Sequence, residues 1–178
     1  MAVPNASNTA EVSGTAKLLV VLLAFAWGLN WTAAAIALTE TPPWAMRFAG
    51  AGIGTIAVFT AALLAGHPLV VPPRERVHVA IAGFLNVAAF QVLAAFAQLS
   101  GATSRAIVIT YSMPIWTTVL SRIFLGERLD MTRRIAFVLC VAGLGTLVWP
   151  LFAQGFPLFV FLSLGCALSW AGATVYMK

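Results

Sequence analysis

Residues 101–130 have the sequence GATSRAIVITYSMPIWTTVLSRIFLGERLD, which predicts one membrane-spanning helix followed by a charged turn. Pro114 lies in the middle of this stretch. One helix face, defined by the spacing i, i+4, i+7 and i+11, carries Thr110, Pro114, Thr117 and Ser121. A purely structural anchor needs no broken, half-polar centre, so we predict that this helix lines a pathway. The alternative is a kinked helix that only packs against its neighbours.

The composition is that of a membrane protein. Of the 178 residues, 61% are hydrophobic and 8% are charged, whereas about 25% of the residues of a soluble domain are charged. The mean hydropathy is +0.97. Since one bilayer crossing needs about 20 mainly apolar residues, the length allows six crossings with short loops. We therefore predict an all-α, polytopic membrane helix bundle with lipid as its surroundings and no nucleic-acid partner.

Hydrophobic runs and their breakers divide the chain into six predicted spans. Residues 1–16 are expected to form a disordered cytoplasmic tail. The spans are predicted at residues 18–38, 44–65 and 77–99, in the first part of residues 101–130, and at residues 135–153 and 157–177. Pro42 and Pro43 make the first connection a tight helical hairpin.

The distribution of basic residues predicts the orientation, because cytoplasmic loops are enriched in Lys and Arg. With the N-terminus inside, the outer side receives only Arg47 and Arg105. The inner side receives Lys17, Arg74, Arg76, Arg122, Arg128, Arg133, Arg134 and Lys178. Both termini are therefore expected to be cytoplasmic.

The first predicted span carries a polar and aromatic face. Trp27, Asn30 and Trp31 share this face because they are spaced i, i+3 and i+4. Polar side chains inside a bilayer are costly unless they pair or face water, so we predict that this face borders a substrate. The alternatives are that the tryptophans pack or lie at the membrane interface, and that Asn30 hydrogen-bonds a neighbouring helix.

Arg47 is the one charged residue clearly inside a predicted span. It lies only about 5 Å beyond the helix start at a rise of 1.5 Å per residue, where a long side chain can reach the membrane surface and the cost of its charge falls. We favour a role as an anchor at this surface. The alternative is that Arg47 pairs with a substrate carboxylate at the outer mouth of a site.

The third predicted span contains three amides. Asn86 and Gln91 differ by five positions, so an α-helix would point them to different sides, and at most one is expected to face a shared cavity. Gln91 and Gln98 are seven positions apart and share a face.

In the fourth predicted span, Pro114 removes a backbone donor and frees the carbonyl of Thr110. Such carbonyls are tolerated in a membrane where they line a cavity or are bonded by neighbours. Tyr111 is expected either to contact an apolar substrate or to bond a neighbouring helix.

Several kinds of function are not supported by any motif. No Asp or Glu lies inside a predicted span, although proton-coupled carriers commonly use such a carboxylate. The sequence shows no catalytic triad, zinc pair, phosphate loop or dinucleotide turn. Cys140 and Cys166 lie in apolar runs and are expected to be small buried hydrophobes. We expect no enzyme, no cofactor and no metal.

With these residues in view, the chain resembles the EamA-type transporters of the drug/metabolite transporter superfamily. The resemblance rests on the order and spacing of short segments, none of them decisive alone. They are AWGLNW in the first span, PPWAMRF at the start of the second, Pro114 followed by FLGERLD, GLGTLVW at the end of the fifth, and LSWAGATVYMK in the sixth.

The resemblance implies an inner-membrane secondary transporter, usually an exporter of amino acids, other metabolites or drugs, which works by alternating access. It also implies two inverted five-helix repeats with substrate held between them. On this basis residues 17–153 would be a first repeat and residues 154–178 the start of an incomplete second one. The residues expected along the pathway are Trp27, Asn30, Trp31, Arg47, Tyr111 and Pro114, and the polar Asn86 is added to them.

The six predicted spans amount to about half of such a carrier. One expectation is therefore that the chain pairs with a second copy or another half-transporter. The second hypothesis is a truncated, inactive or accessory membrane protein. A third is a small multidrug carrier that works as an oligomer, which is disfavoured because the first span lacks the membrane carboxylate usual in such carriers.

Overall fold

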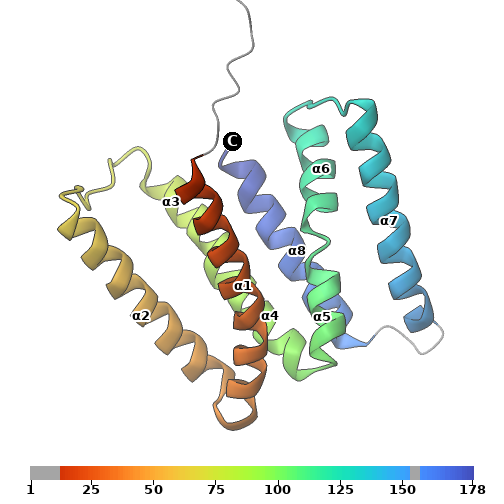
Figure 1. Ribbon diagram of the computed structural model, residues 1–178, viewed down its shortest axis with the longest axis horizontal. Helices are drawn as coiled ribbons and strands as arrows, with labels where there is room; N and C mark the ends of the chain where they lie inside the picture. The colour runs from red at the N-terminus through yellow and green to blue at the C-terminus, as the bar shows by residue number, and fades with distance from the viewer. Residues whose placement is uncertain (1–12, 153–156) are drawn as a thin grey trace, which may run out of the picture.

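The computed structural model describes residues 13–152 and 157–178, and within these residues every regular element is a helix (Figure 1). The elements are α1 (Gly14–Glu40), α2 (Pro43–Leu64), α3 (Arg76–Gly83), the π-helix η1 (Phe84–Ala89), α4 (Phe90–Leu99), α5 (Thr103–Thr110), α6 (Met113–Phe124), α7 (Met131–Phe152) and α8 (Leu158–Tyr176). Together they make six helical segments long and apolar enough to cross a membrane. The predicted all-α membrane bundle with six spans is confirmed.

The observed spans begin and end within a few residues of the predicted positions. The largest differences are at the N-terminal ends of α1 and α7. Helix α1 begins at Gly14, so residues 14–16 are helical and not part of a tail, while residues 1–12 lie outside the described residues. Ser13 caps this helix, because its Oγ accepts a hydrogen bond from the Ala16 amide at 3.2 Å.

The third span is not a uniform α-helix. Residues Arg76–Leu99 form one continuous segment, but its middle, Phe84–Ala89, is a π-helix. A π-helix closes its hydrogen bonds between residues five apart, so each turn is wider than an α-helical turn, and such turns are frequent at functional sites. No pattern in the sequence predicted this change of geometry.

The fourth span is broken, as its sequence suggested, but the break precedes Pro114. Helix α5 ends at Thr110 and α6 begins at Met113, so that Pro114 lies in the first turn of a new helix, where its missing N–H removes no helical bond. Ser112 lies in the break, and its hydroxyl donates to the Ile109 carbonyl at 2.6 Å. The same hydroxyl accepts a hydrogen bond from Trp116 Nε1 at 3.1 Å.

Helix α8 is the central element of the bundle. It packs against α4, α5 and α6 and has eight buried residues, more than any other described helix. Its small residues permit this close approach: a Cβ at Gly165 would lie 3.2 Å from Leu93 Cδ1. Helix α8 therefore forms the centre of the packed core.

Helices α2 and α7 lie at opposite edges of the bundle (Figure 1). No residue of α2 is buried, although the helix is almost entirely apolar. In a soluble protein such an exposed apolar surface would promote aggregation. A membrane helix is instead surrounded by the hydrocarbon of the lipids. The exposed apolar side chains of these helices are therefore consistent with contact to lipid.

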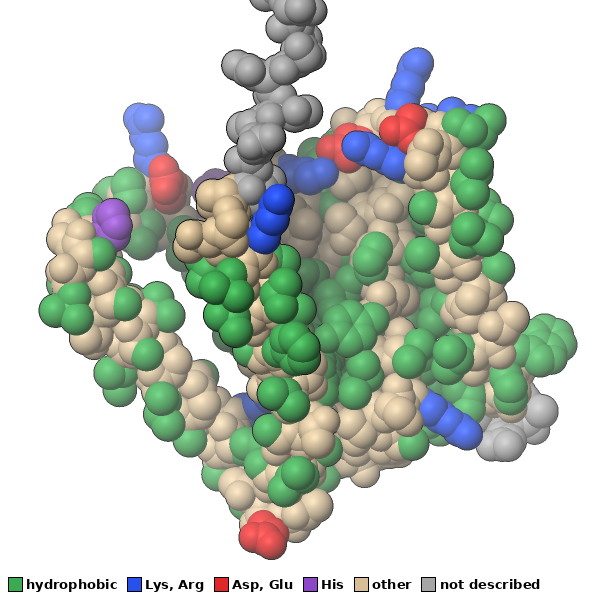
Figure 2. Space-filling view, in the orientation of Figure 1, with side chains coloured by type: hydrophobic (Ala, Val, Ile, Leu, Met, Phe, Trp, Pro, Cys, Tyr) green, Lys and Arg blue, Asp and Glu red, His purple; other side chains and the backbone are tan. Residues whose placement is uncertain are grey.

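Charged side chains gather at one end of the bundle, the end where the C-terminus lies (Figure 2). Two contacts there connect different helices. Lys178 Nζ lies 2.8 Å from Glu127 Oε1 in the loop between α6 and α7, and His78 Nδ1 of α3 lies 2.5 Å from the Tyr176 hydroxyl of α8.

The turn between α4 and α5 gives a test of the packing. A Cβ at Gly101 would lie 2.5 Å from Cγ and 2.9 Å from Cβ of Phe159, which is buried at the start of α8. We expect Gly101→Ala to destabilise the protein by about 1–3 kcal/mol, because the stem of the phenylalanine cannot move aside easily. The measurement is the thermal unfolding midpoint of the purified protein in detergent.

Gly143→Ala is the matched control, because a Cβ at Gly143 in α7 would meet nothing within 4 Å. This change should leave the midpoint unchanged or raise it slightly, since alanine favours a helix. Equal midpoints for both variants would contradict the packing between this turn and α8.

Candidate functional site

A cavity of about 360 Å³ lies among α1, α4 and η1, with α2 and α8 each adding one residue to its wall. Its residues extend from the middle of the bundle toward the end where α1 joins α2. They are Leu23, Ala26, Trp27, Asn30, Trp31, Ala34, Arg47, Asn86, Val87, Phe90, Gln91, Ala94, Gln98 and Trp170. The volume lies within the range of small-molecule sites, about 300–1,000 Å³.

Five of the seven residues predicted from the sequence lie in the wall of this one cavity. They are Trp27, Asn30, Trp31, Arg47 and Asn86. Tyr111 lies outside the wall, and its ring centroid is 6.2 Å from that of Trp31. Pro114 is exposed on α6 and does not contact the cavity. The expectation that the fourth span lines a pathway therefore does not hold for either cavity described here, since neither contains a residue of α5 or α6.

The prediction that Asn86 and Gln91 point to different sides was wrong, because both contribute to the same cavity wall. The cause is η1, which contains Asn86 and ends just before Gln91. The wider π-helical turn brings residues five apart toward one face, whereas an α-helix would separate them. The expectation that Gln91 shares a face with Gln98 is confirmed, since α4 is an α-helix from Phe90 onward.

Helix α8 donates two side-chain hydrogen bonds to the backbone around the π-helical turn. The Ser169 hydroxyl donates to the Leu85 carbonyl at 2.5 Å, and the Cys166 thiol donates to the Phe90 carbonyl at 3.6 Å. Backbone carbonyls in a membrane need such partners because no water is there to bond them. These bonds place Trp170, the neighbour of Ser169, against the cavity.

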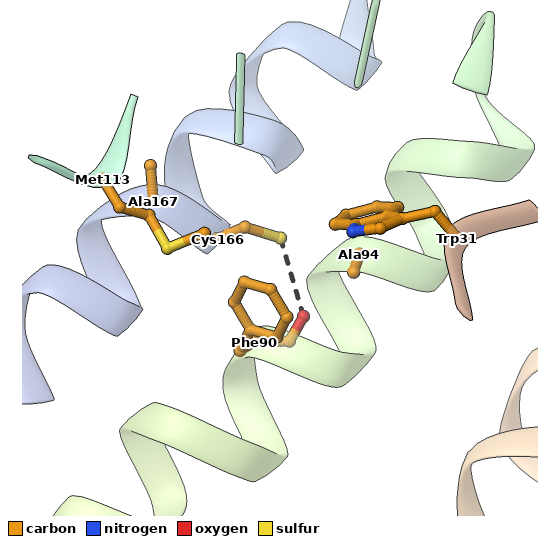
Figure 3. Close-up of a cluster of buried hydrophobic side chains, with 6 residues drawn as sticks. All are labelled: Trp31, Phe90, Ala94, Met113, Cys166 and Ala167. Carbon is orange, nitrogen blue, oxygen red and sulfur yellow. Dashed lines mark hydrogen bonds between the residues drawn. The ribbon is translucent and has the colours of Figure 1, made fainter. Parts of the chain in front are cut away.

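One wall of the cavity is aromatic and rests on the core of the bundle. The ring centroid of Trp170 lies 5.5 Å from that of Trp27 and 5.2 Å from that of Phe90, both in edge-to-face geometry. Beneath this wall, buried side chains from four helices pack together: Trp31, Phe90, Ala94, Met113, Cys166 and Ala167 (Figure 3). Because the wall is continuous with this core, we expect it to hold its shape.

The polar part of the wall is formed by amides and one guanidinium group. Arg47 Nη1 donates to Gln91 Oε1 at 2.7 Å, while the Nε of Arg47 is buried without a partner. Gln98 Nε2 donates to the Trp31 carbonyl at 3.1 Å, and its Oε1 is also buried without a partner. No Asp or Glu lines the cavity.

Trp170, Gln91 and Gln98 were not among the predicted site residues. The seven-residue spacing of the two glutamines was a usable signal, because it places both on the face of α4 that also carries Phe90 and Ala94. No pattern in the sequence related Trp170 to the first span. The contact between Trp170 and Trp27 depends on how α8 packs against the other helices.

A second cavity, of about 1,200 Å³, separates α2 from α1 and the third span. Figure 2 shows this opening beside α2. It shares Asn30, Arg47 and Gln91 with the first cavity, so Arg47 borders both spaces. Small residues, including Gly50 and Gly54, line the side formed by α2.

The chemistry available at this site is binding through apolar contact, amide hydrogen bonds and one positive charge. The described residues include no group of three His, Cys, Asp or Glu side chains arranged to hold a metal ion. Nothing in the cavity wall resembles a nucleophile paired with a base.

The hydroxyl of Ser169 provides a test of the π-helical turn. We expect Ser169→Ala to lower the free energy of unfolding by about 1–3 kcal/mol, because the Leu85 carbonyl then loses a hydrogen bond away from water. Ser104→Ala is the control, since Ser104 is exposed at the start of α5. Thermal unfolding in detergent measures both, and an unchanged midpoint for Ser169→Ala would contradict the assigned role.

Comparison with known proteins identifies the family. Residues 14–149 match the EamA-like transporter family. The chain is similar to YvbV, an uncharacterized transporter of Bacillus subtilis (strain 168), with 30% identity over 164 residues, which is 90% of this chain and 53% of the relative. The chain thus spans about half the length of this relative. No solved structure matches the chain. With six apolar helices of bilayer length among its described residues, the chain is an integral membrane protein and belongs to the EamA-like transporter family.

Proposed function

We propose that the protein takes part in the secondary transport of small organic solutes across a bacterial inner membrane, with the cavity beside α1 as part of the solute site. The single observation that carries this proposal is a cavity of small-molecule size that combines an aromatic wall with amides and one guanidinium group. Intramembrane polar groups of this kind mark substrate pathways in membrane proteins. Membership of a transporter family supports the same function.

The proposed mechanism is alternating access, in which the site faces each side of the membrane in turn. The cavity extends toward the end where α1 joins α2, and the opposite end carries most of the basic residues. By the positive-inside rule the basic end is cytoplasmic. We infer that the described conformation is nearer to one that is open to the outer side, with both termini cytoplasmic. Export is proposed as the direction of transport because the resemblance to EamA-type transporters implies it.

A second candidate follows from the length of the relative. Because the chain covers 53% of that protein, the complete transport unit in our proposal includes further helices, supplied by a second copy or by another half-transporter. In the alternative, the chain has no transport activity without such a partner and is an accessory membrane protein. Transport by the purified chain in vesicles, measured with and without candidate partners, separates the two.

The accessibility of engineered cysteines tests the proposed site. In a background with Cys140→Ser and Cys166→Ser, which keeps a donor for the Phe90 carbonyl, we expect Asn30→Cys and Asn86→Cys to react with a small water-soluble thiol reagent, because water in the cavity allows the thiolate to form. A transported solute should slow both reactions. Labelling rates in membrane vesicles provide the measurement.

Leu139→Cys is the control, since Leu139 is exposed on α7, where lipid is expected to surround it. This position should stay unreactive with or without solute. Unreactive cysteines at both positions 30 and 86 would exclude the cavity as an aqueous solute site.

A further inference from the structure

We propose that the cavity selects solutes that carry a carboxylate, which binds the guanidinium group of Arg47 while an apolar or aromatic body lies against Trp27, Phe90 and Trp170. This inference rests on the proposed function and adds the chemical class of the solute. Four observations about the charge, its surroundings and the shape of the cavity support it.

The first observation is that the charge of Arg47 is not neutralised. The ion pairs among the described residues are Arg133 with Asp130 and Lys178 with Glu127, and neither involves Arg47. The guanidinium group has one side-chain partner, the neutral Gln91, and its Nε is buried without any. An unpaired charge away from water is costly. An anionic ligand would supply the missing partner.

The second observation is that Arg47 does not have the environment of a membrane anchor. An anchoring arginine extends its head toward water, and Arg105, at the same end of the bundle, is exposed. Arg47 is instead partly buried, and its side chain reaches across to the third span, where it bonds Gln91. The anchor that the sequence favoured therefore fits this geometry less well than a binding role.

The third observation is the positive charge of the cavity wall. The cavity wall holds one positive group, four neutral amides and no acidic side chain. A solute ammonium group would find no carboxylate in the wall and would be repelled by Arg47. A carboxylate matches the planar fork of donors that a guanidinium group presents.

The fourth observation is the position of the aromatic wall. Trp27, Trp170 and Phe90 form a continuous chain of edge-to-face contacts within the same cavity as Arg47. A cavity of about 360 Å³ holds a small molecule with one charged end and one ring or branched chain. The site therefore favours an amphipathic organic anion over an inorganic one.

A pair of probes that differ only in charge tests this proposal. Phenylacetate and the neutral phenylacetamide have nearly the same shape, and each would be titrated into the full chain in lipid nanodiscs, with binding followed by calorimetry. We expect phenylacetate to bind about tenfold or more tightly than phenylacetamide, because hydrogen bonds to a charged partner are about twice as strong as neutral ones.

Variants of Arg47 and Arg105, which lie at the same end of the bundle, show which arginine causes the preference for phenylacetate. We expect Arg47→Gln to weaken phenylacetate binding about tenfold or more, which corresponds to about 1.4 kcal/mol, and to leave phenylacetamide binding unchanged. Arg105→Gln should leave both affinities within about twofold, because an exposed charge outside the cavity contributes little. Circular dichroism and gel filtration check that each variant is folded.

Three results would overturn the proposal: no phenylacetate binding, equal binding of both probes to the unaltered protein, or unchanged phenylacetate binding in folded Arg47→Gln. If Arg47→Gln does not fold, the comparison of the two probes on the unaltered protein decides. Equal binding together with solute protection of the cysteines at positions 30 and 86 would reject carboxylate selection and leave the transport site in place. Loss of cysteine reactivity would instead reject the site itself.

Discussion

The structure depends on how backbone carbonyls are satisfied where the third span widens into a π-helix. A carbonyl that is left unbonded inside a bilayer has no water as a partner, so donors from a neighbouring helix stabilise the backbone around this widening. Helix α8 supplies them from Ser169 and Cys166, two residues spaced i and i+3 on one face. The small residues around them let the two helices approach closely enough. The widened turn then brings Asn86 and Gln91 into one wall, and the approach of α8 completes that wall with Trp170.

The candidate site lies at the boundary between tightly and loosely packed parts of the protein. Its aromatic wall is continuous with a core built from α1, α4, α6 and α8, whereas Arg47 belongs to α2, which has no buried residue. The bond from Arg47 to Gln91 is one of the few polar contacts that connect α2 with the third span. Segments with few buried contacts move most easily, so a displacement of α2 would change the size and the charge of the cavity together while the aromatic wall remains in place.

The sequence predicted the fold class and most of the candidate site, because both follow from periodicity along single helices. Hydropathy and proline breaks located six spans, and the i, i+3, i+4 spacing grouped Trp27, Asn30 and Trp31 correctly. The errors arose where tertiary packing changes local geometry or chooses neighbours. A uniform α-helix was assumed for the third span, so Asn86 and Gln91 were separated. Tyr111 and Pro114, which the family resemblance placed along the pathway, lie outside the walls of both cavities, because α5 and α6 pack against α8.

The contacts at the basic end of the bundle differ in kind from those in the interior. Lys178 with Glu127, and His78 with Tyr176, connect segments distant in sequence through side chains that water can reach. Exposed ion pairs contribute only about 0–1 kcal/mol, whereas separating α8 from α4 would expose bonded carbonyls and packed aromatic rings to hydrocarbon. The free-energy cost of separating neighbouring helices therefore differs along the bundle. The polar contacts at the basic end resist a movement of α8 less than the bonded turn does, and this turn can serve as the pivot.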